Sequence, residues 1–127
     1  NPKNQVLLGK RKNSYKAGMY GLPGGRIELN EAMMTAITRE VAEETRLTGL
    51  VFSFVGVVRE NQGEYDFVHC IFAANITDQQ PVLCEPDKCE GWEWLDLDKD
   101  FMEVLPGHRA GIKLYKNGGH LADLVAN

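Results

Sequence analysis

The feature that most constrains this chain is a block of acidic residues at the end of a predicted helix. Three glutamates, Glu40, Glu43 and Glu44, stand within five residues. Residues 31–45 have the periodicity of an amphipathic helix. At about 100° per residue, Glu44 projects roughly 20° and Glu40 roughly 60° from Ile37, which lies on the apolar stripe. Because charges that only keep a helix soluble lie on its opposite face, the pattern predicts carboxylates that are turned inward.

Inward-facing carboxylates repel one another unless a cation is bound among them. Several carboxylate oxygens without a nearby His or Cys suit a hard divalent ion, Mg²⁺ or Mn²⁺, which also recruits the phosphates of a substrate. Crowding raises the proton affinity of carboxylates, so one of the glutamates is a candidate general base. The alternative is an amphipathic helix with a solvated acidic edge, and an isolated E-x-x-E-E pattern fits that alternative better. Here the inward stripe and the glycines upstream favour the metal site.

A glycine turn precedes the predicted helix. Residues 23–25, Pro-Gly-Gly, allow a tight turn in which the backbone approaches a ligand closely, because glycine has no Cβ. Arg26 and Glu28 leave this turn on a short strand with their charges on one face. Asn30 is the predicted N-cap of the helix, and Glu31 is expected in its first turn.

Together these residues resemble the Nudix box, the signature of hydrolases that cleave a nucleoside diphosphate linked to another group. The resemblance covers residues 25–47, with Gly25, then Glu31 after five residues, then the run 39–47 after seven more. The flanking segments resemble MutT-like nucleoside triphosphate pyrophosphohydrolases; these are residues 6–12, 21–23 and 90–95.

One position departs from the box. Arg46 stands where the family has a glycine that lets the chain leave the helix with a positive φ angle. Either Arg46 adopts a costly backbone conformation, or the turn is delayed to Gly49. We expect the departure to affect the exit loop and to leave the metal-binding carboxylates unaltered.

The resemblance implies a set of functional residues. The implied metal ligands are the Gly24 carbonyl and the carboxylates of Glu40, Glu43 and Glu44. The implied catalytic residues are Glu43, Glu40 and Arg39, with Glu43 as a further ligand or as the base. The implied substrate-binding residues are Arg26, Glu28, Arg11, Lys10 and Tyr20. Tyr20 either stacks on a base or packs in the core, and Glu90 competes with Glu85 and Asp87 as an additional acidic ligand.

The resemblance also implies the fold and the reaction. The expected fold is α/β, a Nudix-type α-β-α sandwich around a mixed sheet, in one domain over residues 1–127. Such proteins usually have a strand before the one at Gln5; only residues 1–4 precede it here, so we expect that first strand to be missing from the given sequence. The expected reaction is Mg²⁺-dependent hydrolysis of a nucleoside triphosphate to the monophosphate and pyrophosphate. The alternatives are a catalytically weak nucleotide-binding module and an isoprenoid-diphosphate isomerase, which would need a catalytic cysteine.

Composition adds limits. With 127 residues, 43% of them hydrophobic, the chain is long enough for one domain with a core. The three cysteines fit no CxxC motif, and no segment reads as a membrane span or a signal sequence. A net charge of -4 argues against a polymeric nucleic acid as the partner. We therefore expect a cytoplasmic enzyme with a small nucleotide substrate; homodimers are common among its relatives.

Outside the box, the remaining secondary structure is predicted from pattern and turn signals. Strands are predicted at residues 5–10, 51–58, 65–74, 81–84 and 92–95. A helix is predicted at residues 110–116, ended by two glycines. Trp92 and Trp94 lie in the last strand, where we expect one indole in the core and the other facing outward or lining a pocket.

Overall fold

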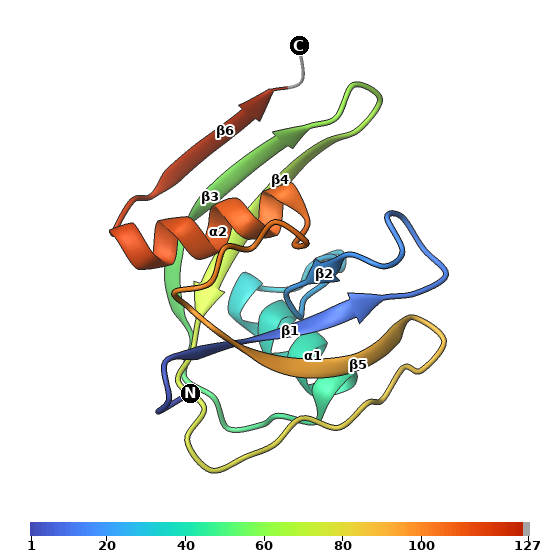
Figure 1. Ribbon diagram of the computed structural model, residues 1–127, viewed down its shortest axis with the longest axis vertical. Helices are drawn as coiled ribbons and strands as arrows, with labels where there is room; N and C mark the ends of the chain where they lie inside the picture. Colours follow the sequence, from blue (N-terminus) through green and yellow to red (C-terminus); the bar gives the residue numbers. More distant parts are fainter. Residues whose placement is uncertain (126–127) are drawn as a thin grey trace.

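The computed structural model describes residues 1–125, which form two small sheets and two helices (Figure 1). The elements in chain order are β1 (Gln5–Arg11), β2 (Tyr20–Gly21), α1 (Met33–Thr45), β3 (Ser53–Asn61), β4 (Asp66–Ala73), β5 (Cys89–Asp96), α2 (Pro106–Asn117) and β6 (Leu121–Val125). One sheet has the strand order β2-β1-β5 and the other β4-β3-β6. The α/β prediction is confirmed, with the strands divided between two sheets in place of one. In this part of the chain neither helix is long and apolar enough to cross a membrane.

The first sheet is covered on both faces because β1 is apolar on both faces. Leu7 and Leu8 are adjacent, so their side chains point to opposite sides of the strand. Leu7 packs in a buried cluster with Val41 of α1 and with Leu47. Leu8, which is fully buried, packs in a second cluster with Ile112 of α2. Strand β1 thus places α1 on one side of the sheet and α2 on the other, as the sandwich prediction requires.

The second sheet is the mixed one. Strand β3 pairs antiparallel with β4 and parallel with β6, and α2 packs on it through a cluster of Val58, Ala110 and Leu114. Strand β6 was not predicted. Its entry lies so close to β3 that a Cβ on Gly56 would stand 2.5 Å from the carbonyl oxygen of His120. A parallel edge strand of five residues depends on this tertiary contact, which leaves little signal in its own sequence.

Two other predicted elements need correction. Residues 81–84 do not form a strand; the Val82 N–H donates to the carbonyl of Thr45 at 2.9 Å, so the segment is a loop over the end of α1. Helix α2 begins at Pro106, ahead of the predicted start at Ala110, because proline is well suited to the first turn of a helix.

The boundaries of α1 also differ in part from the prediction. Asn30 is not the N-cap; it occupies a turn with φ 65°, and the helix begins at Met33 after Ala32. The turn forms because the Glu31 N–H donates to the Glu28 carbonyl at 3.0 Å. At the other end Arg46 takes the left-handed conformation, with φ 62° and its N–H bonded to the Ala42 carbonyl. Of the two alternatives for the missing glycine, the first therefore holds.

We expect Arg46→Gly to stabilise the protein, because a side chain in the left-handed region costs about 1–2 kcal/mol. A gain of ~1 kcal/mol corresponds to a rise in the melting temperature of about 4 °C for a chain of this size. Thermal unfolding followed by circular dichroism measures it. Arg46→Ala is the matched control, since it removes the side chain but keeps the backbone cost, and it should give no gain. Equal melting temperatures for the two variants would contradict the interpretation.

Candidate metal and phosphate site

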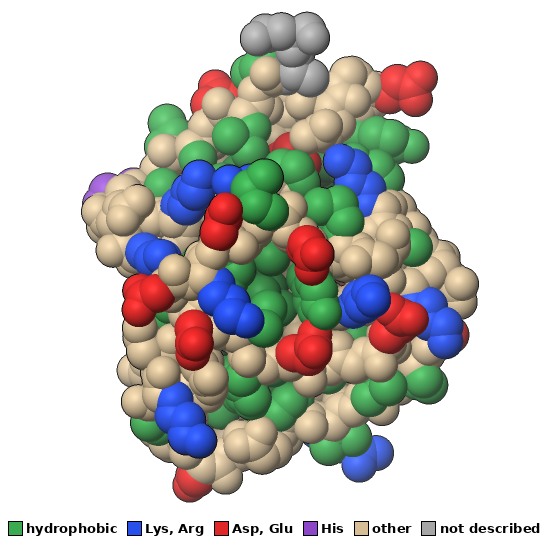
Figure 2. All heavy atoms as spheres, viewed as in Figure 1, with side chains coloured by type: hydrophobic (Ala, Val, Ile, Leu, Met, Phe, Trp, Pro, Cys, Tyr) green, Lys and Arg blue, Asp and Glu red, His purple; other side chains and the backbone are tan. Residues whose placement is uncertain are grey.

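A large cleft of about 1570 Å³ runs between the two sheets and past the acidic end of α1. Its walls are mostly apolar, and the polar groups of the box line one part of it; these are Gly24, Gly25, Arg39, Glu40, Glu43 and Glu44. On the face shown in Figure 2, acidic and basic side chains alternate and do not form a continuous basic surface.

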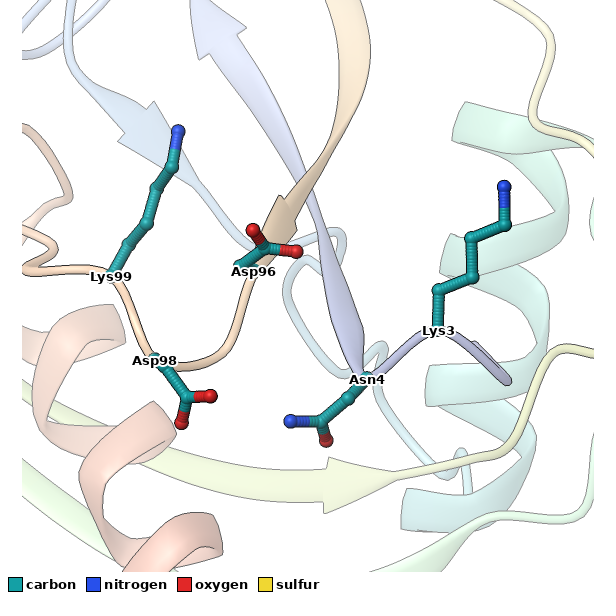
Figure 3. Close-up of a pocket in the computed structure, with 5 residues that line it drawn as sticks. All are labelled: Lys3, Asn4, Asp96, Asp98 and Lys99. Carbon is teal, nitrogen blue, oxygen red and sulfur yellow. The ribbon is translucent and has the colours of Figure 1, made fainter.

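A second, smaller hollow of about 330 Å³ lies at the start of β1 and the end of β5 (Figure 3). It is lined only by Lys3, Asn4, Asp96, Asp98 and Lys99. No box residue reaches this hollow, so the chemistry predicted from the sequence belongs to the large cleft.

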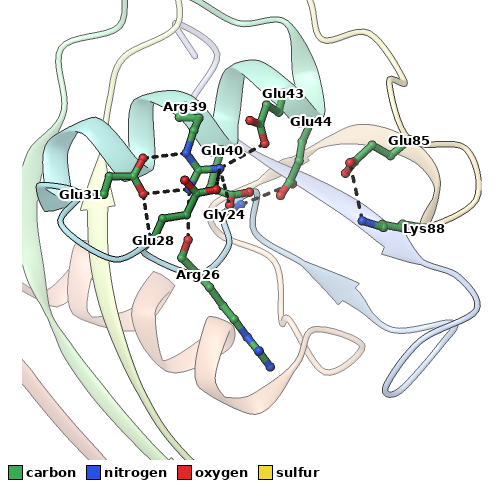
Figure 4. A network of polar contacts seen from close by, with 10 residues as sticks. All are labelled: Gly24, Arg26, Glu28, Glu31, Arg39, Glu40, Glu43, Glu44, Glu85 and Lys88. Atoms are coloured by element: carbon green, nitrogen blue, oxygen red, sulfur yellow. Dashed lines mark hydrogen bonds and ion pairs between the residues drawn. The ribbon is translucent and has the colours of Figure 1, made fainter.

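Arg39 is the centre of the polar network at the end of α1 (Figure 4). Its Nε and Nη2 donate to the two carboxylate oxygens of Glu31 at 2.7 and 2.9 Å, which is a bidentate pair. Its Nη1 donates to Glu40 at 3.0 Å and to Glu43 at 3.3 Å. One guanidinium therefore holds three carboxylates, and an excess of negative charge remains.

Glu31 is the carboxylate that Arg39 compensates best. Hydrogen bonds from Arg39, and then from the Glu28 backbone N–H at 3.0 Å, lower the pKa of Glu31 to about 2. The residue stands before the first turn of α1, so the pair ties the segment that follows the glycine turn to the middle of the helix. Sequence reasoning placed Glu31 in the box but missed this partner, which lies eight residues away.

Glu44 has the opposite environment. It is half-buried, and among residues 1–125 its carboxylate accepts a single hydrogen bond, a long one of 3.5 Å from the Gly24 N–H. Burial, with added repulsion from Glu40 and Glu85, raises the pKa of Glu44 to about 8. The backbone at this point is held by Trp92, whose indole N–H donates to the Glu44 carbonyl at 3.2 Å. The Glu44 backbone is thus fixed, and within residues 1–125 its carboxylate makes no ion pair, although the charge of Lys88 partly offsets the rise in its pKa.

The glycine turn packs directly against these carboxylates. A Cβ on Gly25 would collide with the carboxylate of Glu40, and Gly24 has a φ angle of 155° that side chains rarely adopt. In residues 1–125 no group of three His, Cys, Asp or Glu side chains is arranged to hold a metal ion by itself. Mg²⁺ does not need one, since it keeps several waters and takes oxygens from substrate phosphates. The half-buried carboxylates beside a tight glycine turn therefore fit a hard divalent cation.

The predicted substrate-binding residues are only partly brought to this cluster. The Arg26 carbonyl accepts a hydrogen bond from Arg39 at 3.2 Å, but its side chain points away from the carboxylates (Figure 4). Glu28 is exposed and stands 3.8 Å from Arg39. Lys10 pairs with Glu90 at 3.6 Å, and the Arg11 Nε donates to the Tyr15 carbonyl at 2.9 Å.

The aromatic residues near the site pack against the hydrophobic core clusters. Tyr20 packs against the cluster around Leu8, and hydrogen bonding to Glu93 raises the pKa of its hydroxyl to about 12. This placement favours the core alternative over stacking on a base. The expected division of Trp92 and Trp94 is not found: both pack against the Leu7 cluster and both line the large cleft, because residues two apart in a strand share one face.

Of the acidic residues considered as an extra ligand, Glu85 has the clearest link to the site. Its charge contributes to the raised pKa of Glu44, and it pairs with Lys88 at 3.8 Å. Glu90 is instead occupied by Lys10. The three cysteines are free thiols, in line with the sequence.

Known proteins match both this sequence and this fold. The NUDIX domain family matches residues 1–115. A putative 8-oxo-dGTP diphosphatase of Bacillus subtilis (strain 168) is 29% identical over 118 residues, which are 93% of this chain and 75% of that protein. An oxidized purine nucleoside triphosphate hydrolase of Danio rerio is 34% identical over 98 residues, which are 75% of this chain and 60% of that protein.

A solved structure agrees. The MutT NUDIX hydrolase of Burkholderia pseudomallei has a TM-score of 0.80 to this chain at 27% identity, with 87% of this chain and 88% of that chain covered. The chain therefore belongs to the Nudix family of hydrolases, and the resemblance stated from the sequence is confirmed.

We expect Glu31→Gln to destabilise the protein in a pH-dependent way. The pKa of Glu31 is lower in the folded protein, about 2, than its ordinary 4.5. The ionised carboxylate therefore stabilises the fold above about pH 4.5, and this contribution is lost as the pH falls toward 2. Melting temperatures of wild type and variant should differ at pH 7 and converge at low pH. Glu28→Gln, at an exposed carboxylate with only the 3.8 Å contact, is the control; a gap that stays constant across pH would sink the argument.

Proposed function

We propose that this Nudix hydrolase cleaves a phosphoanhydride bond of a nucleoside triphosphate and releases the monophosphate and pyrophosphate, with Mg²⁺ as its metal. The observation that carries the proposal is the acidic end of α1, where the half-buried carboxylates of Glu40 and Glu44 lie against the glycine turn and Arg39 binds Glu40 and Glu43. The names of the Bacillus subtilis and Danio rerio relatives, which both describe hydrolysis of a nucleoside triphosphate, support the choice of substrate class.

The metal would be held by the Gly24 carbonyl and by the carboxylates of Glu40, Glu43 and Glu44, and Mn²⁺ is a substitute by the same oxygen chemistry. When bound, the ion neutralises phosphate charge and lowers the pKa of a water. A cation there would also relieve the repulsion between Glu40 and Glu44. Of these two carboxylates, Arg39 hydrogen-bonds only that of Glu40.

The chain's own residues divide the remaining work. Arg39, anchored by Glu31, orients Glu40 and Glu43 on one side of the helix. Glu43 is the more exposed of the two, with 55% of its side chain accessible against 17% for Glu40. It is therefore the better placed to take a proton from the water that attacks phosphorus. Lys10 and Arg11, on β1 beside the cleft, are the candidates to contact the outer phosphates.

Glu44→Gln tests the metal assignment, because it removes a ligand charge with little change in shape. We expect kcat/KM with Mg²⁺ to fall at least about 100-fold, equivalent to ~2.7 kcal/mol of transition-state stabilisation. The circular dichroism spectrum should be unchanged. Glu64→Gln, at an exposed position of the β3–β4 turn, is the matched control and should keep full activity. Near-normal turnover of Glu44→Gln at saturating Mg²⁺ would refute the assignment.

A substrate screen tests the reaction itself. Canonical and oxidised nucleoside triphosphates, sugar nucleotides and dinucleoside polyphosphates are incubated with the enzyme and Mg²⁺, and the products are separated by chromatography. We expect monophosphate and pyrophosphate from a triphosphate, and loss of turnover when EDTA removes the metal. Binding without any product would favour the nucleotide-binding module. Turnover of an isoprenoid diphosphate that thiol alkylation abolishes would favour the isomerase.

A further inference from the structure

The segment that leads into the glycine turn is held by the start of α2. The Tyr20 N–H donates to the Glu103 carbonyl, and the Leu105 N–H donates to the Tyr20 carbonyl, both at 2.9 Å. One step further along, the Leu22 N–H lies beyond β2 and donates to Nδ1 of His108 at 2.8 Å. A side chain of α2 therefore completes the row of hydrogen bonds that backbone groups begin.

This hydrogen bond is close enough to the turn to determine its position. Only Pro23 separates Leu22 from Gly24. The proline ring fixes its own φ angle and restricts the residue before it, so this stretch has few free torsions. Gly24 in turn donates its N–H to Glu44 and has its carbonyl among the proposed metal ligands. Because so few torsions lie between them, a hydrogen bond that fixes Leu22 also fixes the position of Gly24 at the proposed metal site.

The His108 ring is itself fixed by its neighbours. Gly21 leaves room for it, since a Cβ there would stand 3.2 Å from Nδ1. The ring of His69 meets it edge to face at 5.5 Å, and His69 is held by the buried carboxylate of Glu60 at 3.0 Å. These contacts leave Nδ1 aimed at the Leu22 N–H, just past the end of β2.

His108 is in the neutral form that can accept the hydrogen bond from the Leu22 N–H. Burial, and then repulsion from His69 and Arg11, lower the pKa of His108 to about 4. The neutral ring has one nitrogen that accepts a hydrogen bond, and here that nitrogen is Nδ1. At neutral pH the side chain therefore acts as a fixed acceptor.

We propose that His108 is a positioning residue for the metal site: by accepting the Leu22 N–H it holds the Pro23–Gly24 turn against the carboxylates of α1. The inference rests on the proposed function only in taking the Gly24 carbonyl as a metal ligand. His108 touches neither the metal nor the substrate in this role.

The test compares two replacements at one position. His108→Phe keeps a ring against His69 but removes the acceptor, whereas His108→Asn places an amide oxygen near the position of Nδ1 and restores it. His120→Phe, at an exposed histidine before β6, is the matched control. Three quantities are measured: hydrogen exchange of the Leu22 and Gly24 amides by NMR, Mn²⁺ affinity without nucleotide by electron paramagnetic resonance, and kcat/KM.

For His108→Phe we expect about tenfold faster exchange at Leu22 and Gly24 and about tenfold weaker Mn²⁺ binding, as for other groups that orient metal ligands. His108→Asn should recover most of both losses, and His120→Phe should change neither. A folded His108→Phe protein with wild-type exchange and Mn²⁺ affinity overturns the proposal, as does an Asn variant no better than Phe. If the Phe variant does not fold, Gly21→Ala replaces it; pressing a methyl group on Nδ1 should weaken Mn²⁺ binding, and unchanged affinity counts against the proposal.

These readouts separate the inference from the proposed function. If no nucleotide is hydrolysed, the proposed function fails, while amide exchange and Mn²⁺ affinity still decide whether His108 positions the turn.

Discussion

The bidentate pair between Arg39 and Glu31 is the interaction on which the site depends. It ties the segment after the glycine turn to α1, and it holds the guanidinium that donates to Glu40 and Glu43. A guanidinium suits this role because its planar fork can bind two oxygens of one carboxylate and still donate to others. A lysine, with a single compact charge, cannot reproduce that geometry. Arg39 does not reach Glu44, and this excess of negative charge is the physical argument for the proposed cation.

The fold presents this site through the two-sided burial of β1. Leu7 packs against α1 on one face of the sheet, and Leu8 packs against α2 on the other. The glycine turn that follows β2 therefore lies between two helices that separate core clusters hold in place. Trp92 of β5 fixes the acidic end of α1 through the Glu44 carbonyl, and His108 of α2 fixes Leu22, just before the glycine turn. Residues far apart in the sequence thus bind the same few backbone groups. Each of these hydrogen bonds restricts the motion of the backbone at the site.

The sequence predicted the local features well and the long-range ones poorly. The inward carboxylates, the glycine turn and the family follow from spacing within one segment, which a helix converts directly into geometry. Asn30 failed as an N-cap because a turn closed by Glu28 and Glu31 takes its place. Strand β6 and the contact of His108 with Leu22 arise from pairings that only the folded chain creates. Arg46 shows the intermediate case: the pattern identified an unusual position, and the structure decided between two backbone solutions.

The hydrogen bond from Trp92 to the Glu44 carbonyl has a practical consequence. An indole at the acidic end of the helix is an intrinsic fluorophore beside the proposed ligands, and its emission is sensitive to nearby charge and solvent. With Trp94 replaced by a non-emitting aromatic residue, the spectrum of the remaining indole becomes a local optical signal, one that could follow events at this end of the cleft in real time without any attached dye.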